Sequence, residues 1–550
     1  MSPFSLSLIL ALIVSLLSLS FSQPPHGNFL SSLSLSLSLS LTIFFSCFLF
    51  SATLINCGAT VDTEIDGYLW SPDTEFTSTG TPKTLTTPNV LPLLSTVRSF
   101  PISNRKSCYT VPVYRYGKYL IRTTYFYGGI NGQHSPPVFD QIVDGTIWSM
   151  VNTTEDYSKG NYSYYEGVFV AQGKYMSICV ASNSYTDSNP FMSALELVLM
   201  TDSVYNSTDF GKHGLGLIAR HSFGYQGNVI RYPDDQFDRF WEPFGQNDPT
   251  GIISNVSVSG FWNLPPLKVF ETQLTTGPSE HLELQWPVGS IPNSTYYIAL
   301  YFADDHANGS RVFNISVSGI PYYSNLNVTS DGVVVFATQW PLSALTNITL
   351  TPAAGSTVGP LINAGEVFSV LPLGGRTTTR DVLALGDISD EPAILSGEGC
   401  RIRGKRNLEY FKDFRLQLKT FNLDTSTSCL KIKWQEKKDA FYEINYHACI
   451  LCIKGLHFIA LEKVRNSLQH APPDWNGDPC LPSQYSWTGI TCSTGSRIRV
   501  ISLNLTGMDL SGTLSPSIAN LTALSTILLG NNNISGSIPD LSSLKMLEIL

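Results

Sequence analysis

Short hydrophobic segments rich in aromatic and β-branched residues recur along most of the chain. From about Ile55 to Leu373 they alternate with turns rich in Gly, Pro, Asn and Asp, and no long segment has the 3.6-residue period of a helix. Short strands separated by turn residues are typical of an all-β sandwich. The pattern therefore predicts a mainly β fold for this region.

The same region contains an internal repeat. The segment YLIRTTYFY from Tyr119 resembles YIALYFAD from Tyr297, and ALELV from Ala194 resembles AGEVF from Ala364. A repeat at a nearly constant offset indicates two structural copies of one unit. We expect two tandem sandwich domains, over residues 55–205 and 215–373.

Residues 1–54 are apolar and of low complexity. Leucine-rich runs at Phe4–Phe21 and Leu41–Ile55 flank a Ser-Leu alternation at Ser31–Leu41. An apolar N-terminal run indicates entry into the secretory pathway, although the basic n-region of a signal peptide is missing. The run then acts either as a cleaved signal or as an anchor that associates the protein with a membrane. We expect a cell-surface or extracellular protein.

A ladder of leucines fills residues 495–550. One repeat spans Val500–Gly512, and a near-perfect second spans Leu524–Pro539 with Asn532 at its turn. In leucine-rich repeats the apolar side chains pack inward, and the asparagine hydrogen-bonds the turning backbone. Such a solenoid needs about three repeats and a cap to bury its core. Because a third repeat only begins, we expect a truncated gene model with a missing C-terminal span, or an obligate partner.

Residues 386–458 differ in composition from their surroundings. They hold 12 of the 34 Lys and Arg, four of the ten Cys and no glycosylation sequon. Joining the flanking sequences restores one amphipathic helix in which Leu461, Val464 and Leu468 share a face. We therefore expect an anomalous insert, such as a translated intron, followed by a cap region over residues 459–494.

A metal site is the alternative interpretation of this stretch, because Cys449-x-x-Cys452 has the spacing of zinc ligands. A secreted protein favours disulfides over zinc thiolates, so we predict no metal site. The residues concerned are Cys400, Cys429, His447, Cys449 and Cys452.

Charge and motifs limit the possible functions. Charged residues make up 14% of the chain, the net charge is −9, and no basic stripe is present. Nucleic acid is therefore not an expected partner. The chain has no nucleophile elbow, zinc-protease motif, P-loop or kinase motif. We predict no enzymatic activity and no cofactor.

Several short motifs resemble the plant malectin-like domain. They are Asn56-Cys57-Gly58, Arg98–Pro101 ahead of Cys108-Tyr109, and Asp238–Trp241. The segments Asp474–Cys480 and Trp487–Cys492 resemble the disulfide-closed cap of plant leucine-rich repeat ectodomains. In this order, the motifs make the chain similar to plant malectin-like, leucine-rich repeat receptor-like proteins. That group includes receptors with a kinase domain and receptors without one.

The resemblance implies two tandem malectin-like β-sandwiches followed by a short leucine-rich repeat solenoid. It also implies a Cys480–Cys492 disulfide. Cys57, Cys108 and Cys179 form an odd set in which at most one bridge can form, and we favour Cys108–Cys179. Gly365 stands where the family usually has a larger apolar residue, so we expect a weakened strand and a small packing gap there.

Glycosylation sequons support the secretory interpretation. Twelve asparagines begin an N-x-S/T motif without an intervening proline, and we expect at least half of them to be exposed. They are Asn152, Asn161, Asn206, Asn255, Asn293, Asn308, Asn314, Asn327, Asn347, Asn504, Asn520 and Asn533.

The leading functional interpretation is an extracellular receptor-like protein that binds carbohydrate. Malectin binds a glucose disaccharide, and the resemblance therefore suggests a sugar ligand. Aromatic rings stack on sugar faces while polar groups fix the hydroxyls. The candidate residues are Tyr125, Tyr127, Asp140, Trp148, Tyr301 and Asp304.

The alternative is a protein-interaction ectodomain or co-receptor without sugar binding. The concave face of the solenoid would then bind a peptide or a partner kinase, and the sandwiches would act as a spacer. Two acidic clusters carry no catalytic prediction. Asp304-Asp305-His306 is interpreted as a polar turn, and Asp234-Asp235 with Asp238 as a solvated or calcium-tolerant loop.

Overall fold

The computed structural model describes residues 52–88, 90–132, 135–245, 261–304, 310–377 and 460–550, and the backbone of 418–424, 429–435 and 441–446. These residues are mainly β, as predicted. None of the helices among them has the length and hydrophobicity needed to cross a bilayer. The apolar leader up to residue 51 and most of the predicted insert lie outside the described residues, as do Cys400, His447, Cys449 and Cys452.

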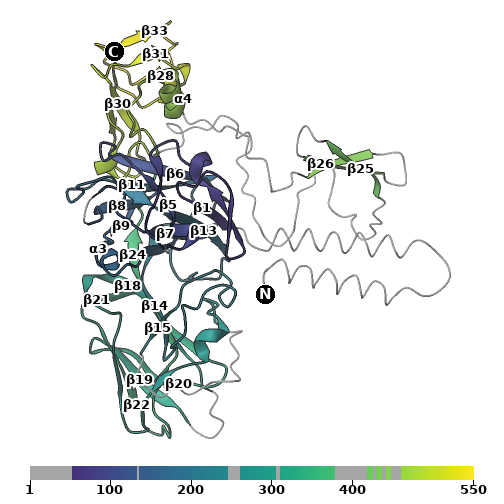
Figure 1. The fold of residues 1–550 in the computed structure, drawn as a ribbon, viewed down its shortest axis with the longest axis vertical. Helices are drawn as coiled ribbons and strands as arrows, with labels where there is room; N and C mark the ends of the chain where they lie inside the picture. Colours follow the sequence, from purple (N-terminus) through teal and green to yellow (C-terminus); the bar gives the residue numbers. More distant parts are fainter. Residues whose placement is uncertain are drawn as a thin grey trace, which may run out of the picture.

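One long sheet runs through the described β-rich region (Figure 1). We call the part built from β1 to β13 the first lobe and the part from β14 to β24 the second lobe. The path of the sheet is β2 (Thr63–Ile65), β3 (Tyr68–Pro72), β1 (Ala52–Asn56), β13 (Ala194–Met200), β7 (Lys118–Tyr125), β10 (Ser163–Val170), β14 (His213–Phe223), β24 (Ala364–Pro372), β18 (Ile291–Phe302) and β21 (Val333–Ala344), with β15 (Glu242–Phe244) beside β14.

A second sheet packs against the long one in each lobe, and the strand order is the same in both. The long sheet contributes β1-β13-β7-β10 to the first lobe and β14-β24-β18-β21 to the second. Side chains from both sheets share one core in each lobe, for example Ile121 with Val111 and Ile298 with Phe313. The second sheets are β6 (Lys106–Pro112), β11 (Tyr175–Ala181), β8 (Phe139–Val143) and β9 (Thr146–Val151), and β17 (Leu282–Gln285), β22 (Asn347–Pro352), β19 (Val312–Val317) and β20 (Ile320–Asn327).

Short elements complete the lobes. Three strands form a small sheet, β12 (Phe191–Met192), β5 (Thr96–Ser99) and β4 (Thr81–Thr84), and two form a pair, β16 (Leu274–Thr275) and β23 (Leu361–Ile362). The helical turns are η1 (Asp73–Glu75), η2 (Pro92–Leu94), α3 (Thr154–Ser158) and η3 (Leu267–Phe270). Beyond the lobes, β25 (Leu418–Asp424), β26 (Cys429–Gln435) and β27 (Phe441–Tyr446) pair antiparallel.

The two lobes meet where β10 pairs with β14. Gly167 pairs with Gly216, and Val168 pairs with Leu215. A Cβ on Gly167 would lie 2.9 Å from the Leu215 carbonyl oxygen, and one on Gly216 would lie 2.8 Å from Ser369 Oγ. Glycine at both positions therefore leaves room for neighbouring side chains to pack over the pairing of β10 with β14. The long sheet continues across it without a break.

The packing gap expected at Gly365 is absent. A Cβ on Gly365 would lie 2.8 Å from Cη2 of Trp286 and 3.2 Å from Phe223. Trp286 is fully buried, and its indole occupies the space that a larger residue at position 365 would fill. The expectation was wrong because the bulky side chain of the residue that follows β17 complements the glycine.

His221 beside Trp286 makes the stability of the second lobe sensitive to acid. His221 Nδ1 accepts a 3.0 Å hydrogen bond from Trp286 Nε1, and burial lowers the pKa of His221 to about 4. The pKa of His221 is lower in the folded state than in the unfolded state. The stability that the neutral imidazole contributes is therefore fully present above about pH 6.5 and is lost as the pH falls towards 4. Lowering the pH from 7 to 4.5 should cost about 2 kcal/mol through His221, partly offset by Glu242 at 3.9 Å from Nε2.

Urea unfolding of the protein and of His221→Gln at both pH values measures this effect. Glutamine keeps an acceptor for Trp286 but does not titrate. The acid-induced loss of unfolding free energy should be about 2 kcal/mol smaller in the variant. Equal losses in both proteins would contradict the assignment.

A buried ionic cluster fills the space where the lobes join. Arg122 Nη2 lies 3.0 Å from Glu166 Oε2, and Arg220 Nη1 lies 2.6 Å from Glu166 Oε1. Arg122 also pairs with Glu196, and Arg220 pairs with Glu366 at 2.6 Å. Burial disfavours charge on Arg122, but the surrounding carboxylates raise its pKa above the ordinary value. Glu166 thus bridges an arginine of the first lobe and one of the second.

Two of the acidic residues interpreted as a solvated loop belong to this cluster. Asp238 is buried and pairs with Arg231 at 2.7 Å and with Arg122 at 3.2 Å. Asp235 is fully buried and pairs with Arg239 at 2.8 Å. Only Asp234 is exposed. The solvated-loop interpretation was therefore wrong for Asp235 and Asp238, because arginines compensate their buried charges.

The C-terminal region packs as short coils. Its elements are α4 (Ala460–Ser467), β28 (Leu468–Gln469), η4 (Ser483–Tyr485), β29 (Ile490–Cys492), β30 (Val500–Asn504), β31 (Ser511–Thr513), η5 (Pro516–Asn520), β32 (Thr526–Leu528) and β33 (Asn533–Ser535). β30 pairs parallel with β32, and β31 pairs parallel with β33. The part of the predicted helix that follows the insert is confirmed as α4, with Leu461 and Val464 buried, whereas Leu468 lies just beyond it in β28.

Asn532 binds the backbone as predicted. Its Oδ1 accepts hydrogen bonds from the amides of Met508 and Leu510, and its Nδ2 donates to the carbonyls of Leu505 and Leu529. One side chain therefore satisfies backbone groups of two successive coils. Both expected disulfides, Cys108–Cys179 and Cys480–Cys492, are also present.

Candidate ligand-binding site between the first lobe and the C-terminal region

The six residues expected to bind a ligand do not come together. Tyr125, Tyr127 and Trp148 lie in the core of the first lobe, with exposed fractions of 0%, 1% and 6%. Tyr301 is buried and donates to Glu366 Oε2 at 2.6 Å, and Asp304 is buried against Arg311. These rings have no exposed face on which a sugar could stack. Their placement therefore lends no support to the prediction that they bind a ligand.

Asp140 is the exception, because it lies at a boundary between parts of the chain. Its Oδ1 accepts a 2.8 Å bond from Asn183, and its Oδ2 accepts a 2.6 Å bond from the hydroxyl of Tyr485 in η4. Tyr485 belongs to the cap region, so Asp140 contacts a segment that lies far from it in the sequence. Figure 1 shows the first lobe between the second lobe and the C-terminal region.

The glycosylation sequons are mostly on the surface. Asn314 and Asn520 are half-buried, and Asn255 and Asn308 lie outside the described residues. The exposed asparagines are Asn152, Asn161, Asn206, Asn293, Asn327, Asn347, Asn504 and Asn533. The expectation that at least half are exposed is confirmed.

Basic side chains at the start of β6 hold the cap region. Lys106 Nζ donates to the carbonyls of Asp478 and Leu481 at 2.6 and 3.2 Å. Arg105 Nη2 donates to the carbonyl of Gln484 at 2.6 Å. Burial lowers the pKa of Lys106 to about 8, although Asp478 opposes the shift. A lysine that is buried in this way is stabilised by the carbonyl groups around it.

Asp478 links the cap to the chain that leaves the second lobe. Its Oδ1 accepts hydrogen bonds from the amides of Cys480 and Leu481, which order the cap turn. The same carboxylate accepts from the amide of Thr377 at 2.9 Å and from the Thr377 hydroxyl at 2.5 Å. Thr377 also forms a parallel bridge with Ile498. One carboxylate therefore joins two segments that adjoin the first lobe.

Close backbone packing completes this interface. Gly477 has a φ of +62°, and a Cβ there would lie 2.6 Å from Cys108 Sγ. Gly477 therefore lets the cap turn rest on the Cys108–Cys179 disulfide. Gly145 similarly makes room for Leu481, because a Cβ on Gly145 would lie 2.7 Å from the Leu481 Cβ. The backbones of the first lobe and the cap region thus come into close contact at these two glycines.

Replacing Tyr485 by phenylalanine should lower the free energy of unfolding by about 1–2 kcal/mol. The change removes a single 2.6 Å bond to the Asp140 carboxylate and leaves that carboxylate with one fewer donor. Urea unfolding measures the loss. Tyr323→Phe is the matched control, because Tyr323 is 47% exposed and lies on β20, away from the cap. An equal effect of the two substitutions would contradict the assigned role of the Tyr485 hydroxyl.

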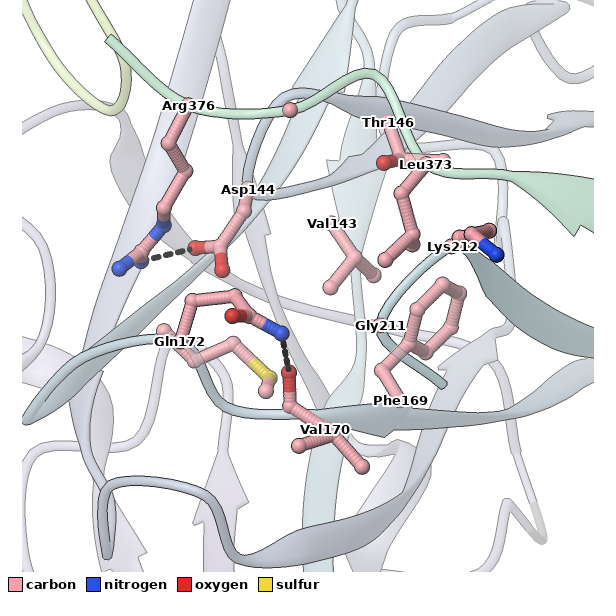
Figure 2. Close-up of a pocket in the computed structure, with 12 residues that line it drawn as sticks. Val143, Asp144, Thr146, Phe169, Val170, Gln172, Gly211, Lys212, Leu373 and Arg376 are labelled. Atoms are coloured by element: carbon pink, nitrogen blue, oxygen red, sulfur yellow. Dashed lines mark hydrogen bonds and ion pairs between the residues drawn. The ribbon is translucent and has the colours of Figure 1, made fainter. Parts of the chain in front are cut away.

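A groove of about 410 Å³ lies beside this interface, and we call it the junction groove (Figure 2). Three separate parts of the chain line it: the first lobe, the connection between the lobes at Gly211-Lys212, and the segment after β24. Its apolar lining residues are Val143, Phe169, Val170, Met176 and Leu373, and its polar ones are Asp144, Thr146, Gln172, Lys212 and Arg376.

Two basic side chains border the junction groove. Arg376 Nη2 lies 2.9 Å from Asp144 Oδ1 and donates to the carbonyl of Tyr175 at 3.1 Å. The exposed Lys212 pairs with Asp209 at 3.1 Å. In Figure 2 the side chains of Val143 and Leu373 lie between Arg376 and Lys212. An apolar floor between two cations can hold a ligand that carries both apolar and anionic groups.

Sequence reasoning did not identify the groove residues. Asp144 carries no recognisable binding motif, and Arg376 follows the last strand of the second lobe without any motif around it. The segments that meet here are distant in the sequence. In the described residues, no group of three or more His, Cys, Asp or Glu is arranged to hold a metal ion.

Family comparisons agree with this architecture. The profile of the Malectin-like domain matches residues 55–370, and that of the Leucine rich repeat N-terminal domain matches residues 459–493. A leucine-rich repeat receptor-like serine/threonine-protein kinase of Arabidopsis thaliana is 28% identical over 453 residues, which are 78% of this chain and 41% of the kinase.

A second receptor-like kinase from Arabidopsis thaliana is 27% identical over 509 residues, covering 88% of this chain and 46% of the kinase. The chain thus spans less than half the length of these relatives. Among solved structures, the crystal structure of the ANX2 ectodomain from Arabidopsis thaliana has a TM-score of 0.50 and 17% identity, covering 59% of this chain and 98% of that one. At this identity the likeness is one of fold.

Proposed function

The chain belongs to the malectin-like domain family, as found in plant leucine-rich repeat receptor-like proteins, and from that premise we propose that it is a non-catalytic, extracellular ligand-binding protein. Its ligand is a peptide or a protein segment. The exposed sequons and the two disulfides support a location on the cell surface or outside the cell.

The observation that carries this proposal is the packing of the cap region on the first lobe. Lys106, Asp478 and Gly477 hold the two parts together through hydrogen bonds and close backbone contact. The junction groove lies beside this contact and is lined by the first lobe, the connection between the lobes and the segment after β24. A concave site that rigid elements build in advance loses little entropy when a ligand binds.

The architecture that accompanies this function is also a proposal. We infer that the two lobes are tandem copies of one sandwich domain, because their strand orders correspond. The parallel strand pairs and the bonds of Asn532 support leucine-rich repeats after the cap. Repeats of this kind present a surface to which a co-receptor kinase could bind.

Carbohydrate binding is the second candidate. The family resemblance favours it, whereas the burial of Tyr125, Tyr127 and Tyr301 does not. Membrane association through the N-terminal apolar segment stays a prediction, because that segment lies outside the described residues.

Two parallel screens of the secreted, glycosylated full chain test the proposal. One screen uses a glycan array, followed by titration of the best saccharides to millimolar concentration. The other uses a phage-displayed library of random peptides. We expect reproducible enrichment of peptides and no saturable binding of saccharides. Saturable saccharide binding without peptide enrichment would overturn the proposal in favour of carbohydrate recognition.

A further inference from the structure

We propose that the junction groove binds a short acidic peptide segment in which an apolar side chain lies between two carboxylates. This inference deepens the proposed function and rests on it. The apolar floor of the groove is formed by Val143, Phe169 and Leu373, and a cationic side chain stands on each side of it (Figure 2). A volume of about 410 Å³ is within the range of roughly 300–1,000 Å³ found for ligand pockets.

Arg376 lines the groove and supplies the first cation. Within the described residues, its bonds to Asp144 and Tyr175 are made through Nη2. A Cβ on Gly173 would lie 2.7 Å from Nη1, so the glycine leaves this nitrogen room. A guanidinium has five N–H donors in a planar fork that matches a carboxylate. The contact with Asp144 through Nη2 holds the guanidinium of Arg376 in place, while its other N–H groups remain as donors for a ligand.

Lys212 supplies the second cation. Its side chain is 76% exposed and its pairing with Asp209 is a surface ion pair, which contributes little free energy and exchanges readily. Its backbone carbonyl accepts from the amide of Leu373 at 2.9 Å. The backbone of Lys212 is therefore tied to the floor of the groove, while its ammonium group can turn to a ligand.

Exposed tyrosines extend this surface. Tyr114 and Tyr116 are 48% and 55% exposed, and the guanidinium of Arg115 lies 4.8 Å from the centre of the Tyr116 ring. The Tyr116 amide donates to the Ala171 carbonyl, which places this turn beside Gln172 in the groove lining. Exposed aromatic and arginine side chains are enriched where proteins bind partners.

Charge selects the occupant. The whole chain carries a net charge of −9, so a groove bordered by Lys212 and Arg376 departs from its general character. Arg376 and Lys212 favour an anionic ligand over a basic one, and a wholly apolar ligand would desolvate the exposed Lys212–Asp209 ion pair without offering it a hydrogen bond. In an acidic peptide with a central apolar residue, the apolar side chain can pack on the floor and the carboxylates can pair with the cations of the border.

Fluorescence anisotropy with three capped, labelled peptides tests the inference. The probe is Glu-Leu-Phe-Glu, and the comparison peptides are Lys-Leu-Phe-Lys and Glu-Ser-Ser-Glu. The full chain should bind the probe at least tenfold more tightly than either comparison peptide. Raising the NaCl concentration from 0.1 to 0.5 M should weaken binding of the probe, since exposed charges are screened.

Lys212→Glu should weaken binding of the probe by about tenfold. The matched control is Lys159→Glu, because Lys159 also sits in an exposed pair, with Glu155, and lies outside the groove. Unchanged thermal unfolding of both variants shows that the fold is intact. The inference is overturned if the probe does not bind at 1 mM, if the comparison peptides bind equally well, or if both variants behave alike. If the acidic-peptide inference fails but the phage screen enriches peptides of another chemistry, the proposed function is still supported. Saccharide binding without peptide enrichment would contradict both the inference and the proposed function.

Discussion

Replacing Glu366 by alanine is expected to lower the free energy of unfolding by about 3–5 kcal/mol. Glu366 is fully buried and pairs with Arg220 at 2.6 Å. It also accepts 2.6 Å hydrogen bonds from the hydroxyls of Tyr205 and Tyr301. The substitution would leave a buried guanidinium short of countercharge and two buried hydroxyls without their acceptor. Uncompensated buried charge is among the most destabilising changes in a protein interior.

The charge of Glu366 adds an acid-dependent component to this loss. Burial opposes ionisation of Glu366, but Arg220 and Arg239 hold its pKa below the ordinary value of 4.5. The contribution is therefore present above about pH 4.5 and is lost as the pH falls through the folded-state pKa. The difference in stability between the protein and the variant should be largest near neutral pH and should shrink in acid.

Urea unfolding at pH 7 measures the effect of Glu366→Ala. Glu271→Gln is the control, because Glu271 forms a half-exposed pair with Lys268 and should change stability by less than about 1 kcal/mol. A loss below 1 kcal/mol for Glu366→Ala would show that the cluster does not hold the lobes together. The same result would weaken the proposal that the groove is built on rigid elements.

The regular parts of the fold were predictable because each leaves a local signal. The strands of the two lobes follow from short hydrophobic segments separated by turn residues, and α4 follows from the spacing of Leu461 and Val464. The role of Asn532 follows from its position in a repeated pattern, and the cap disulfide follows from family resemblance. These features depend on residues that are close in the sequence or belong to a recurring unit.

Features that depend on distant residues were not predictable. The continuous sheet rests on the pairing of two short stretches, around Val168 and Leu215, which have no unusual composition. The same holds for Trp286, which fills the space above Gly365. Complementary packing across strands is a property of the folded chain and leaves no pattern in either segment.

The ionic cluster did leave a signal. Glu196 and Glu366 occupy the same position in the similar segments ALELV and AGEVF, each within an otherwise apolar strand. A charge kept in an apolar strand indicates a buried partner, since an isolated buried carboxylate is strongly destabilising. The same pattern argues against solvation of Asp235 and Asp238, which lie within a run that also supplies Arg239 and Trp241.

The predicted sugar-binding residues illustrate the opposite difficulty. Tyr125, Tyr127 and Tyr301 were chosen because they are aromatic and lie on or directly after strands, which is also the composition of a sandwich core. The junction groove instead combines strand ends such as Val143 and Val170 with turns and with the segment after β24, and function commonly resides in such connecting segments. Turn residues such as Asp144 and Gln172 have no periodicity, so the sequence alone could not group them.

Replacing Gly477 by valine is expected to separate the cap region from the first lobe, with a loss of about 3 kcal/mol or more. A β-branched residue is strained at a φ of +62°, and its Cβ would lie 2.6 Å from Cys108 Sγ, which a disulfide holds in place. The cap turn would have to move away, and the bonds of Lys106 and Asp478 across the interface would be lost with it.

Hydrogen exchange of the Thr377 and Leu481 amides follows this disruption: the Thr377 amide bonds Asp478 across the interface, and the Leu481 amide bonds the same carboxylate within the cap turn. Gly507→Val is the matched control, since Gly507 has a φ of +68° and no heavy atom lies within 4 Å of its ideal Cβ position. Exchange of the two amides should accelerate at least a hundredfold in Gly477→Val and remain unchanged in the control. If Gly477→Val leaves these amides protected, the cap does not depend on the disulfide surface for its position. If it exposes them and peptide binding is lost as well, the junction groove requires the cap in place, and the malectin-like lobes and the leucine-rich cap then act as one recognition unit.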